Sequence, residues 1–123
     1  MKILVVDDST TMRKILINAL KSVGITEIDE AGNGQQAVDA ARSASYDVIL
    51  MDWNMPQMLG IDALKMIRLS GNTVPVIMVT TEAEKSRVIE ALKAGANNYV
   101  IKPFMPEAII TKIQEVTGTA AKQ

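Results

Sequence analysis

Polar side chains that could do chemistry stand in this sequence directly after short runs of aliphatic residues. They are Asp7 and Asp8 after Ile3–Val6, Asp52 after Asp47–Met51, Thr80 after Val74–Val79, and Lys102 after Tyr99–Ile101. If the aliphatic runs are parallel strands, their carboxyl ends meet at one edge of a sheet, and ligands of open α/β sheets bind outside that edge. We therefore expect three carboxylates, a hydroxyl group and an ammonium group to converge there.

Three converging carboxylates repel one another, so their charge must be offset. Two like charges about 4 Å apart repel by roughly 4 kcal/mol at an effective dielectric near 20, and either a shared proton or a bound cation relieves this repulsion. The sequence contains no Cys and no His, which leaves a site built from oxygen ligands. Such a site favours Mg²⁺, which uses one or two carboxylates directly and leaves positions open for a phosphate oxygen.

Asp52 is the best candidate for a nucleophile in this cluster. A carboxylate beside Mg²⁺ and Lys102 can attack phosphorus and become an acyl phosphate, while the two cations neutralise the phosphoryl oxygens. The Thr80 hydroxyl would donate a hydrogen bond. Each residue also has an ordinary interpretation, since the acids suit turns, Thr80 or Thr81 suits a helix cap, and Lys102 suits a solvated surface. Their shared position after predicted strands favours the functional interpretation.

The rest of the sequence alternates strand-like and helix-like segments. The expected strands are Ile3–Val6, Ile25–Glu30, Asp47–Met51, Val74–Val79 and Tyr99–Ile101. Between and after them, apolar residues recur at helical spacing: Met12, Ile15, Leu16, Ala19, Leu20 and Val23; Ala37, Val38 and Ala41; Ile61, Leu64 and Ile67; Val88, Ala91 and Leu92; Ile109, Ile113 and Val116. This alternation predicts an α/β, doubly wound fold, in which five helices flank a five-stranded parallel sheet on both faces.

Composition narrows the class of protein. The 123 residues suit one domain. Thirteen Lys and Arg against 14 Asp and Glu give a net charge of −1, which argues against binding to DNA or to a membrane surface. The lack of Cys and His excludes disulfides, thiol nucleophiles, Ser-His-Asp triads and zinc sites with those ligands. Without a long apolar run or a recognisable signal peptide, we expect a cytoplasmic protein.

Four motifs resemble the receiver domain of two-component response regulators. They are VVDDSTTMR, MDWNMP, MVTTEA and AGANNYVIKPF, which carry the paired acids, the single Asp, the Thr and the Lys-Pro pair. The sequence is most similar to CheY-like single-domain chemotaxis regulators, over essentially the whole chain. The resemblance implies a flavodoxin-like sheet of strand order 2-1-3-4-5, which is taken from the family. It also implies a receiver domain over residues 1–118 and a short tail over residues 119–123.

The resemblance implies roles for the residues around the acid cluster. Asp52 would be the phosphorylation site. The side chains of Asp8 and Asp52 and the backbone carbonyl of Asn54 would bind Mg²⁺, and Asp7 would help through a water molecule. Lys102 would form an ion pair with the phosphoryl group.

The family pattern further implies a switch. Thr80 would bond to the phosphoryl group, and Tyr99 would turn inward as Thr80 moves. Asn54 and Glu82 match positions that tune the lifetime of the phosphoryl group, and the Lys102–Pro103 peptide bond would be cis. Trp53, the single tryptophan, would pack beside the site and report on it.

Two positions depart from the family pattern. Leu59 stands where Asp or Asn is common before a glycine, and Met105 stands where a threonine often caps the last helix, a loss of about 1 kcal/mol. Met105 would instead be available to a partner. The expected output surface covers the fourth helix, the fifth strand and the fifth helix, and its residues are Lys85, Ile89, Lys93, Tyr99 and Met105.

These features predict a monomeric, phosphorylation-activated switch. It would take its phosphoryl group from a histidine kinase and signal to the flagellar motor switch protein. It would not be an enzyme but a phosphoacceptor that assists its own phosphorylation and dephosphorylation. Within the same class, the alternative is a phosphotransfer intermediate in a relay outside chemotaxis.

Two alternatives come from other classes of protein. A small phosphatase or nucleotide-binding enzyme could use the same fold. However, a haloacid-dehalogenase-type phosphatase would have an acid where Thr10 stands, and a nucleotide binder would have a glycine-rich turn after the first strand. An interaction module that is never phosphorylated is the third alternative, and the intact set of acids, threonine and lysine argues against it.

Overall fold

Five short segments pair into one parallel sheet in the computed structural model, which describes residues 1–118. The strands are β1 (Lys2–Val6), β2 (Glu27–Ala31), β3 (Val48–Met51), β4 (Val76–Thr80) and β5 (Asn98–Ile101). They lie in the order β2-β1-β3-β4-β5. The predicted fold class and strand order are confirmed, and the expected tail at residues 119–123 lies outside the described residues.

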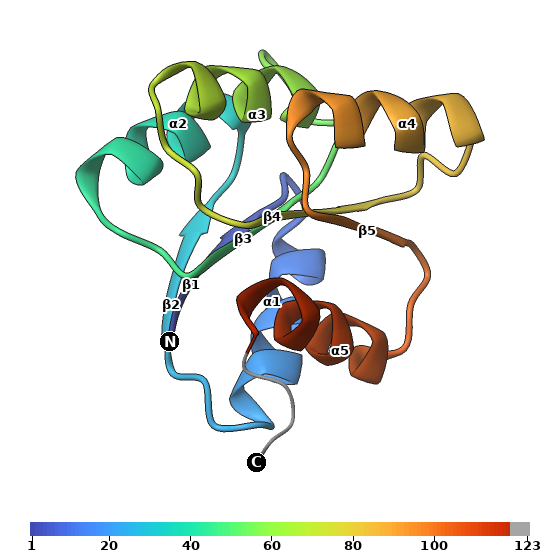
Figure 1. Ribbon diagram of the computed structural model, residues 1–123. Coiled ribbons are helices and arrows are strands. Elements are labelled where there is room, and N and C mark those ends of the chain that lie inside the picture. Colours follow the sequence, from blue (N-terminus) through green and yellow to red (C-terminus); the bar gives the residue numbers. More distant parts are fainter. Residues whose placement is uncertain (119–123) are drawn as a thin grey trace.

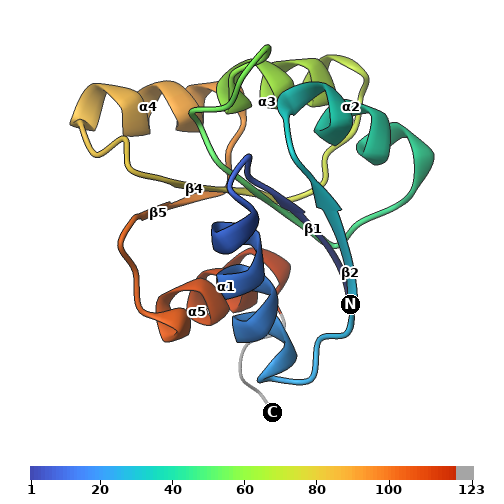
Figure 2. The ribbon, with the colours of Figure 1, turned by 180° about the vertical axis from the view of Figure 1, so that it is seen from behind.

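A helix follows each strand, because parallel neighbours need a crossover connection. The helices are α1 (Thr10–Lys21), α2 (Gly34–Ser43), α3 (Gly60–Leu69), α4 (Lys85–Ala94) and α5 (Pro106–Thr117). Helices α2, α3 and α4 cover one face of the sheet, and α1 and α5 cover the other (Figure 1, and from behind in Figure 2). Because the helices lie on the two faces of the sheet, they leave the edge formed by the carboxyl ends of the strands uncovered.

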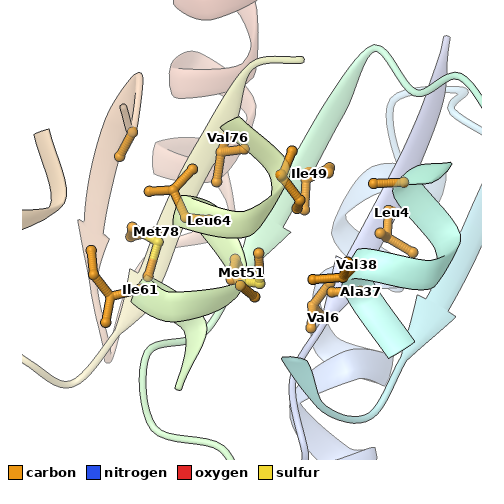
Figure 3. Packing of buried hydrophobic residues seen from close by; sticks show 14 of the residues in the cluster. Leu4, Val6, Ala37, Val38, Ile49, Met51, Ile61, Leu64, Val76 and Met78 are labelled. Atoms are coloured by element: carbon orange, nitrogen blue, oxygen red, sulfur yellow. The ribbon is translucent and has the colours of Figure 1, made fainter. Parts of the chain in front are cut away.

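The three central strands are buried on both faces, so their side chains alternate between two cores. One core lies under α2, α3 and α4, and its labelled residues in Figure 3 are Leu4, Val6, Ala37, Val38, Ile49, Met51, Ile61, Leu64, Val76 and Met78. The other lies under α1 and α5 and contains Ile3, Val5, Leu16, Leu20, Val48, Leu50, Ile77, Val79, Val100, Ile109 and Ile113. Packing on both faces fixes where the carboxyl ends of these three strands lie.

Several expected details are wrong at the margins of the elements. The second strand begins at Glu27 rather than Ile25, because the Ile25 N–H bonds to the carbonyl of Leu20 and completes the turn after α1. Ile15 and Val23 are 44% and 52% exposed, so they do not belong to the inward face of α1. Ile15 lies about 100° around the helix from its buried neighbour Leu16. Val23 lies beyond Lys21, the last residue of the helix.

Helix α4 packs less deeply than its apolar pattern predicts. Only Ala91 is buried, Val88 is half-buried, and Leu92 is 48% exposed, which contradicts its place on the predicted core face. Leu92 lies about 100° around the helix from Ala91, the residue at the centre of the contact, whereas Val88 lies only about 60° from it and stays half-buried. No helix within residues 1–118 is long and apolar enough to cross a membrane.

Candidate functional site

The acidic residues meet at the carboxyl edge of β1 and β3. These two strands are neighbours in register, so Asp7 and Asp8 after Val6 come beside Asp52 after Met51. One carboxylate oxygen from each of the three lies within 4.8 Å of the others. Asp7 and Asp52 are buried, whereas Asp8 is exposed. The structure therefore brings together the three acids that sequence reasoning singled out.

Lys102 reaches the same cluster from the end of β5. Its Nζ lies 2.7 Å from Oδ2 of Asp7 and 3.5 Å from Oδ2 of Asp52. Its backbone N–H donates to the Thr80 carbonyl at 2.8 Å, and the Lys102–Pro103 peptide bond is cis. The alternative of a solvated lysine is wrong, because the Lys102 side chain is only 12% exposed and its ammonium group forms ion pairs with two carboxylates.

Asp52 is held from both sides by backbone contacts. Its N–H donates to the Val6 carbonyl at 3.0 Å, and its Oδ1 accepts the Trp53 N–H at 2.7 Å. The loop that follows folds back, so that the Gly60 N–H donates to the Trp53 carbonyl at 2.8 Å. A Cβ atom at Gly60 would overlap the Asp52 carbonyl oxygen. Sequence reasoning gave this glycine no role, and the available signal was its position between the loop after Asp52 and the helical pattern that begins at Ile61.

The surroundings of Asp52 make its ionisation unfavourable. Burial raises the pKa of Asp52, and the nearby charge of Asp7 acts in the same direction. Lys102, the Thr80 hydroxyl and the Trp53 N–H oppose this shift without reversing it. A cation at the cluster would favour the ionised, nucleophilic form of the carboxyl group.

Asp7 is fixed by contacts that the sequence did not reveal. Its Oδ1 accepts the Ser9 N–H at 2.9 Å, and the Ser9 hydroxyl in turn caps α1 by accepting the Met12 N–H at 3.1 Å. Nη1 of Arg13 donates to the Asp7 carbonyl at 2.6 Å, and Nε of Arg13 lies 2.8 Å from Oε1 of Glu30. Arg13 thus ties the acidic segment to α1 and, through Glu30, to the end of β2.

Thr80 is fully buried at the last position of β4. Its Oγ1 accepts the Glu82 N–H at 3.3 Å, which turns the chain away from the strand. The alternative that Thr80 or Thr81 caps the next helix is wrong, since the residue that precedes α4 is Glu84. The Thr80 hydroxyl therefore lies beside Asp52 rather than at the start of α4.

The loops after β3 and β4 are joined by side chains. Nδ2 of Asn54 donates to Oε2 of Glu82 at 2.9 Å, so the structure brings together the two residues expected to tune the phosphoryl lifetime. Nε of Arg87 lies 3.8 Å from Oε1 of Glu82, and its guanidinium carbon lies 5.5 Å from the centroid of the Trp53 ring. Trp53 is buried, as its expected packing role requires. Arg87 was not singled out from the sequence.

Tyr99 lies half-buried on β5, beside Met78 of β4. Its hydroxyl donates to the backbone carbonyl of Glu82 at 2.7 Å. Burial, followed by the charge of Glu82, raises the pKa of Tyr99 to about 12, so the phenol is protonated and able to donate at neutral pH. Tyr99 therefore contacts the loop that Thr80 begins.

The residues expected to form an output surface are exposed, except for half-buried Tyr99. Ile89 and Met105 are 41% and 68% exposed. Ile89 and Lys93 line a hollow against Lys65 of α3. Two further exposed apolar residues on α4 and β5, Leu92 and Ile101, were not predicted for this surface.

Comparisons with known proteins agree with this fold. A family model described as the response regulator receiver domain matches residues 3–114. The chain is 47% identical over 124 residues to the chemotaxis protein CheY1 of Helicobacter pylori, covering 97% of this chain and 98% of the relative. It is 45% identical over 124 residues to a CheY homolog of Campylobacter jejuni, covering 98% of this chain and 95% of the relative.

Solved structures show the same likeness. The structure of the chemotaxis response regulator CheY4 of Vibrio cholerae matches with a TM-score of 0.86 and 35% identity, over 94% of this chain and 97% of the other. A doubly wound sheet with acids, Thr and Lys at its carboxyl edge defines the receiver class, and the chain belongs to the response regulator receiver domain family, among its CheY-like members. It is a phosphorylation-dependent signalling switch of a two-component system, as the resemblance implied.

Proposed function

We propose that the chain accepts a phosphoryl group on Asp52 from the phosphohistidine of a histidine kinase and signals to the flagellar motor switch protein. The observation that carries this proposal is the placement of the Asp52 carboxylate in a cluster with Asp7 and Asp8, 3.5 Å from the Lys102 ammonium group. The similarity of the chain to chemotaxis proteins is the reason for proposing the flagellar motor switch protein as its target.

The acid cluster suits Mg²⁺. It offers three carboxylate oxygens within 4.8 Å of one another and no nitrogen or sulfur ligand, and Asp52 has a raised pKa that a bound cation would oppose. The side chains of Asp8 and Asp52 and the carbonyl of Asn54 would hold the ion, with Asp7 acting through water. When bound, Mg²⁺ would neutralise phosphoryl oxygens and favour the ionised form of Asp52.

The transfer itself needs only positioning and charge. One Asp52 oxygen forms a bond to phosphorus as the bond from phosphorus to the donor nitrogen breaks, and the electron pair leaves with the imidazole. Lys102 would move from the carboxylates to pair with a phosphoryl oxygen, and the Thr80 hydroxyl would donate to another. In this way the chain assists its own phosphorylation, and with water as nucleophile its own dephosphorylation, while Asn54 and Glu82 set the lifetime.

Thr80 and Tyr99 would carry the change away from the site. Thr80 accepts the Glu82 N–H, and Tyr99 donates to the Glu82 carbonyl. A Thr80 hydroxyl drawn to the phosphoryl group would give up its bond to the Glu82 N–H and release the loop that holds Tyr99. Tyr99 would then turn inward, which shifts the population of a two-state element.

The output surface would comprise Lys85, Ile89, Lys93, Tyr99 and Met105, on α4, on β5 and before α5. Phosphorylation would alter this surface through Tyr99 and raise its affinity for the motor switch protein. The protein would act as a monomer in the cytoplasm, without binding DNA or a membrane. A phosphotransfer protein of another relay is the alternative partner.

Labelling of the phosphoacceptor tests the proposal directly. Purified protein with Mg²⁺ and acetyl phosphate should gain one phosphoryl group by intact mass, and Asp52→Asn should gain none. Asp62→Asn, which removes an exposed carboxylate on α3, is the matched control and should label normally. Undiminished labelling of Asp52→Asn would show that the phosphoacceptor lies elsewhere.

The choice of partner needs a separate experiment. A motor switch peptide and a histidine phosphotransfer domain can each be titrated with the protein, with and without beryllofluoride. Tighter binding of the motor peptide in beryllofluoride supports the chemotaxis output. Phosphoryl exchange with the phosphotransfer domain, together with no motor binding, supports the relay.

A further inference from the structure

A series of side chains joins the loop after β3 to the first turn of α4, beside the proposed phosphorylation site. Asn54 bonds to one oxygen of Glu82, and Arg87 lies against the other. Arg87 also lies over the ring of Trp53, the residue that directly follows Asp52. Arg87 therefore reaches from α4 back to the loop that presents the phosphoacceptor.

The charge of Glu82 faces any anionic molecule that approaches this edge of the sheet. Asp7, Asp8 and Asp52 already make the edge negative, and Lys102 is engaged with two of them. Glu82 adds a fourth carboxylate on the neighbouring loop. Among the described residues, Arg87 is the cation that forms an ion pair with Glu82, with its Nε 3.8 Å from Oε1. Its Nη1 also donates to Oε1 of Glu90, one turn along α4, at 3.1 Å.

We propose that Arg87 is a positioning residue for the phosphorylation reaction. It holds the Glu82 carboxylate against the Asn54 amide and offsets its charge, so that anionic phosphodonors reach Asp52 faster. This inference rests on the proposed function, because it concerns transfer to Asp52. With acetyl phosphate, an Asp52 oxygen bonds to phosphorus, the bond from phosphorus to the acetate oxygen breaks, and acetate leaves with the electron pair. Arg87 takes no part in these bonds.

The expected size of the effect is modest. The side chains of Arg87 and Glu82 are 46% and 31% exposed, so water screens the pair and its contribution to stability is small. Its effect on phosphorylation acts through Glu82, because without Arg87 the Glu82 carboxylate would face an approaching dianion with its charge no longer offset. We expect Arg87 to accelerate phosphorylation about two- to fivefold at low ionic strength.

The experiment compares rates of phosphorylation by acetyl phosphate in saturating Mg²⁺, followed by Trp53 fluorescence and by intact mass. Arg87→Gln removes the charge and Arg87→Lys retains it. Arg42→Gln is the matched control, because it changes net charge equally from an exposed position at the end of α2. Each rate is measured at low salt and at about 0.5 M KCl, where the screening length falls below about 5 Å.

The inference requires a specific pattern of rates. Arg87→Gln should be about two- to fivefold slower than wild type at low salt, Arg87→Lys and Arg42→Gln should be close to wild type, and the deficit should disappear at high salt. In a Glu82→Gln background, Arg87→Gln should have no further effect on the rate. A deficit that persists at high salt, or in the Glu82→Gln background, would overturn the inference and assign Arg87 a structural role.

Failure of this inference can be told apart from failure of the proposed function. If wild-type protein is labelled on Asp52 and Arg87→Gln matches its rate at low salt, Arg87 has no such role and the phosphoacceptor stands. If wild-type protein is not labelled on Asp52 at all, the proposed function fails and takes this inference with it.

Discussion

At the scale of single residues, the site makes opposing demands on the Asp52 carboxyl group. Phosphoryl transfer needs the ionised form, yet burial and the neighbouring charge of Asp7 raise the pKa of Asp52. Lys102 offsets part of this cost from 3.5 Å. Ionising the reactive group therefore costs folding free energy, as is common at functional sites.

Asp52→Asn should stabilise the fold at neutral pH by about 1 to 3 kcal/mol, because it removes a buried charge that is only partly paired. Since the folded pKa is raised from the usual 3.8, the folded state keeps a proton that the unfolded state has already lost. Wild-type stability therefore falls as the pH rises from about 3.8 through the folded pKa. The advantage of the variant should be small below that range and complete above it.

Urea unfolding of both proteins from about pH 3 to about pH 8, followed by Trp53 fluorescence, measures this difference. Asp62→Asn serves again as the control for loss of an exposed carboxylate and should show no such dependence. Equal stability of Asp52→Asn and wild type at neutral pH would mean that Lys102 offsets the whole cost of burial.

Lys102→Met should destabilise the protein by about 3 kcal/mol, because it leaves the carboxylates of Asp7 and Asp52 buried without their cation. Mg²⁺ should raise the melting temperature of this variant more than that of wild type, since the ion would replace the missing charge. Calorimetry with Mg²⁺ and with EDTA measures both effects. Lys112→Met, which breaks only an exposed pair with Glu115, is the control, and an equal response of the two variants to Mg²⁺ would contradict the prediction.

Sequence reasoning could find the site residues that follow strands, since position along the chain alone decides which edge of the sheet they reach. It did so for Asp7, Asp8, Asp52, Thr80 and Lys102. Arg13 and Arg87 lie within helices, where the spacing of a functional charge and that of a solvated charge are the same. Only the contacts of Arg13 with the Asp7 carbonyl, and of Arg87 with Glu82, distinguish them.

At the scale of elements, the start of α3 determines the shape of the site. The helix begins at Gly60, where the chain passes so close to β3 that a side chain would overlap the Asp52 carbonyl. Leu59 precedes the helix and provides no side-chain cap. The position of α3 is therefore set by packing and by the close approach of backbone to backbone.

Gly60→Ala should destabilise the protein by about 3 kcal/mol or more, because the added methyl group overpacks a contact that neither backbone can yield. The shift should also reach Asp52 and slow its phosphorylation. Thermal unfolding and labelling by acetyl phosphate measure the two effects. Gly32→Ala is the matched control, since a Cβ there meets only ordinary contacts beyond 3.4 Å, and a tolerated Gly60→Ala would show that the close approach is not rigid.

The order and type of the elements could be predicted because the central strands are continuous aliphatic runs and each helix has apolar residues at helical spacing. The element boundaries and the inward faces of the helices could be predicted less fully. β2 lies at the edge of the sheet with mostly exposed residues, so its pattern is weak, and the Ile25 N–H closes the turn after α1 instead. Leu92 had the right spacing for a core residue, but α4 makes only shallow contact with the sheet.

At the scale of the whole molecule, one sheet separates two hydrophobic cores. Neighbouring residues of β3 face opposite sides, so Ile49 belongs to the core under α2, α3 and α4, and Leu50 to the core under α1 and α5. Both are fully buried. The same central strands contribute side chains to both cores, so loss of either core would expose one face of a sheet on which the other core depends. We therefore expect the two cores to unfold together.

Ile49→Ala and Leu50→Ala should each lower the free energy of unfolding by about 2 to 5 kcal/mol. The fluorescence of Trp53 reports only on the core under α2, α3 and α4, to which Trp53 belongs. Far-ultraviolet circular dichroism reports on all five helices. The two signals should give the same transition in both variants, because unfolding is cooperative. A Leu50→Ala variant whose dichroism is lost before its Trp53 signal changes would show that the cores are independent.

The bond between Asp7 and Lys102 joins residues 95 positions apart. During synthesis, the acids assemble as soon as β3 pairs with β1, while Lys102 is still to be made. A nascent chain that has formed only its first three strands would therefore hold the three acids together at one edge without the Lys102 ammonium group that pairs with Asp7 and Asp52. Lys102 follows β5, so the residue that offsets the charge of the acids is synthesised after all of them.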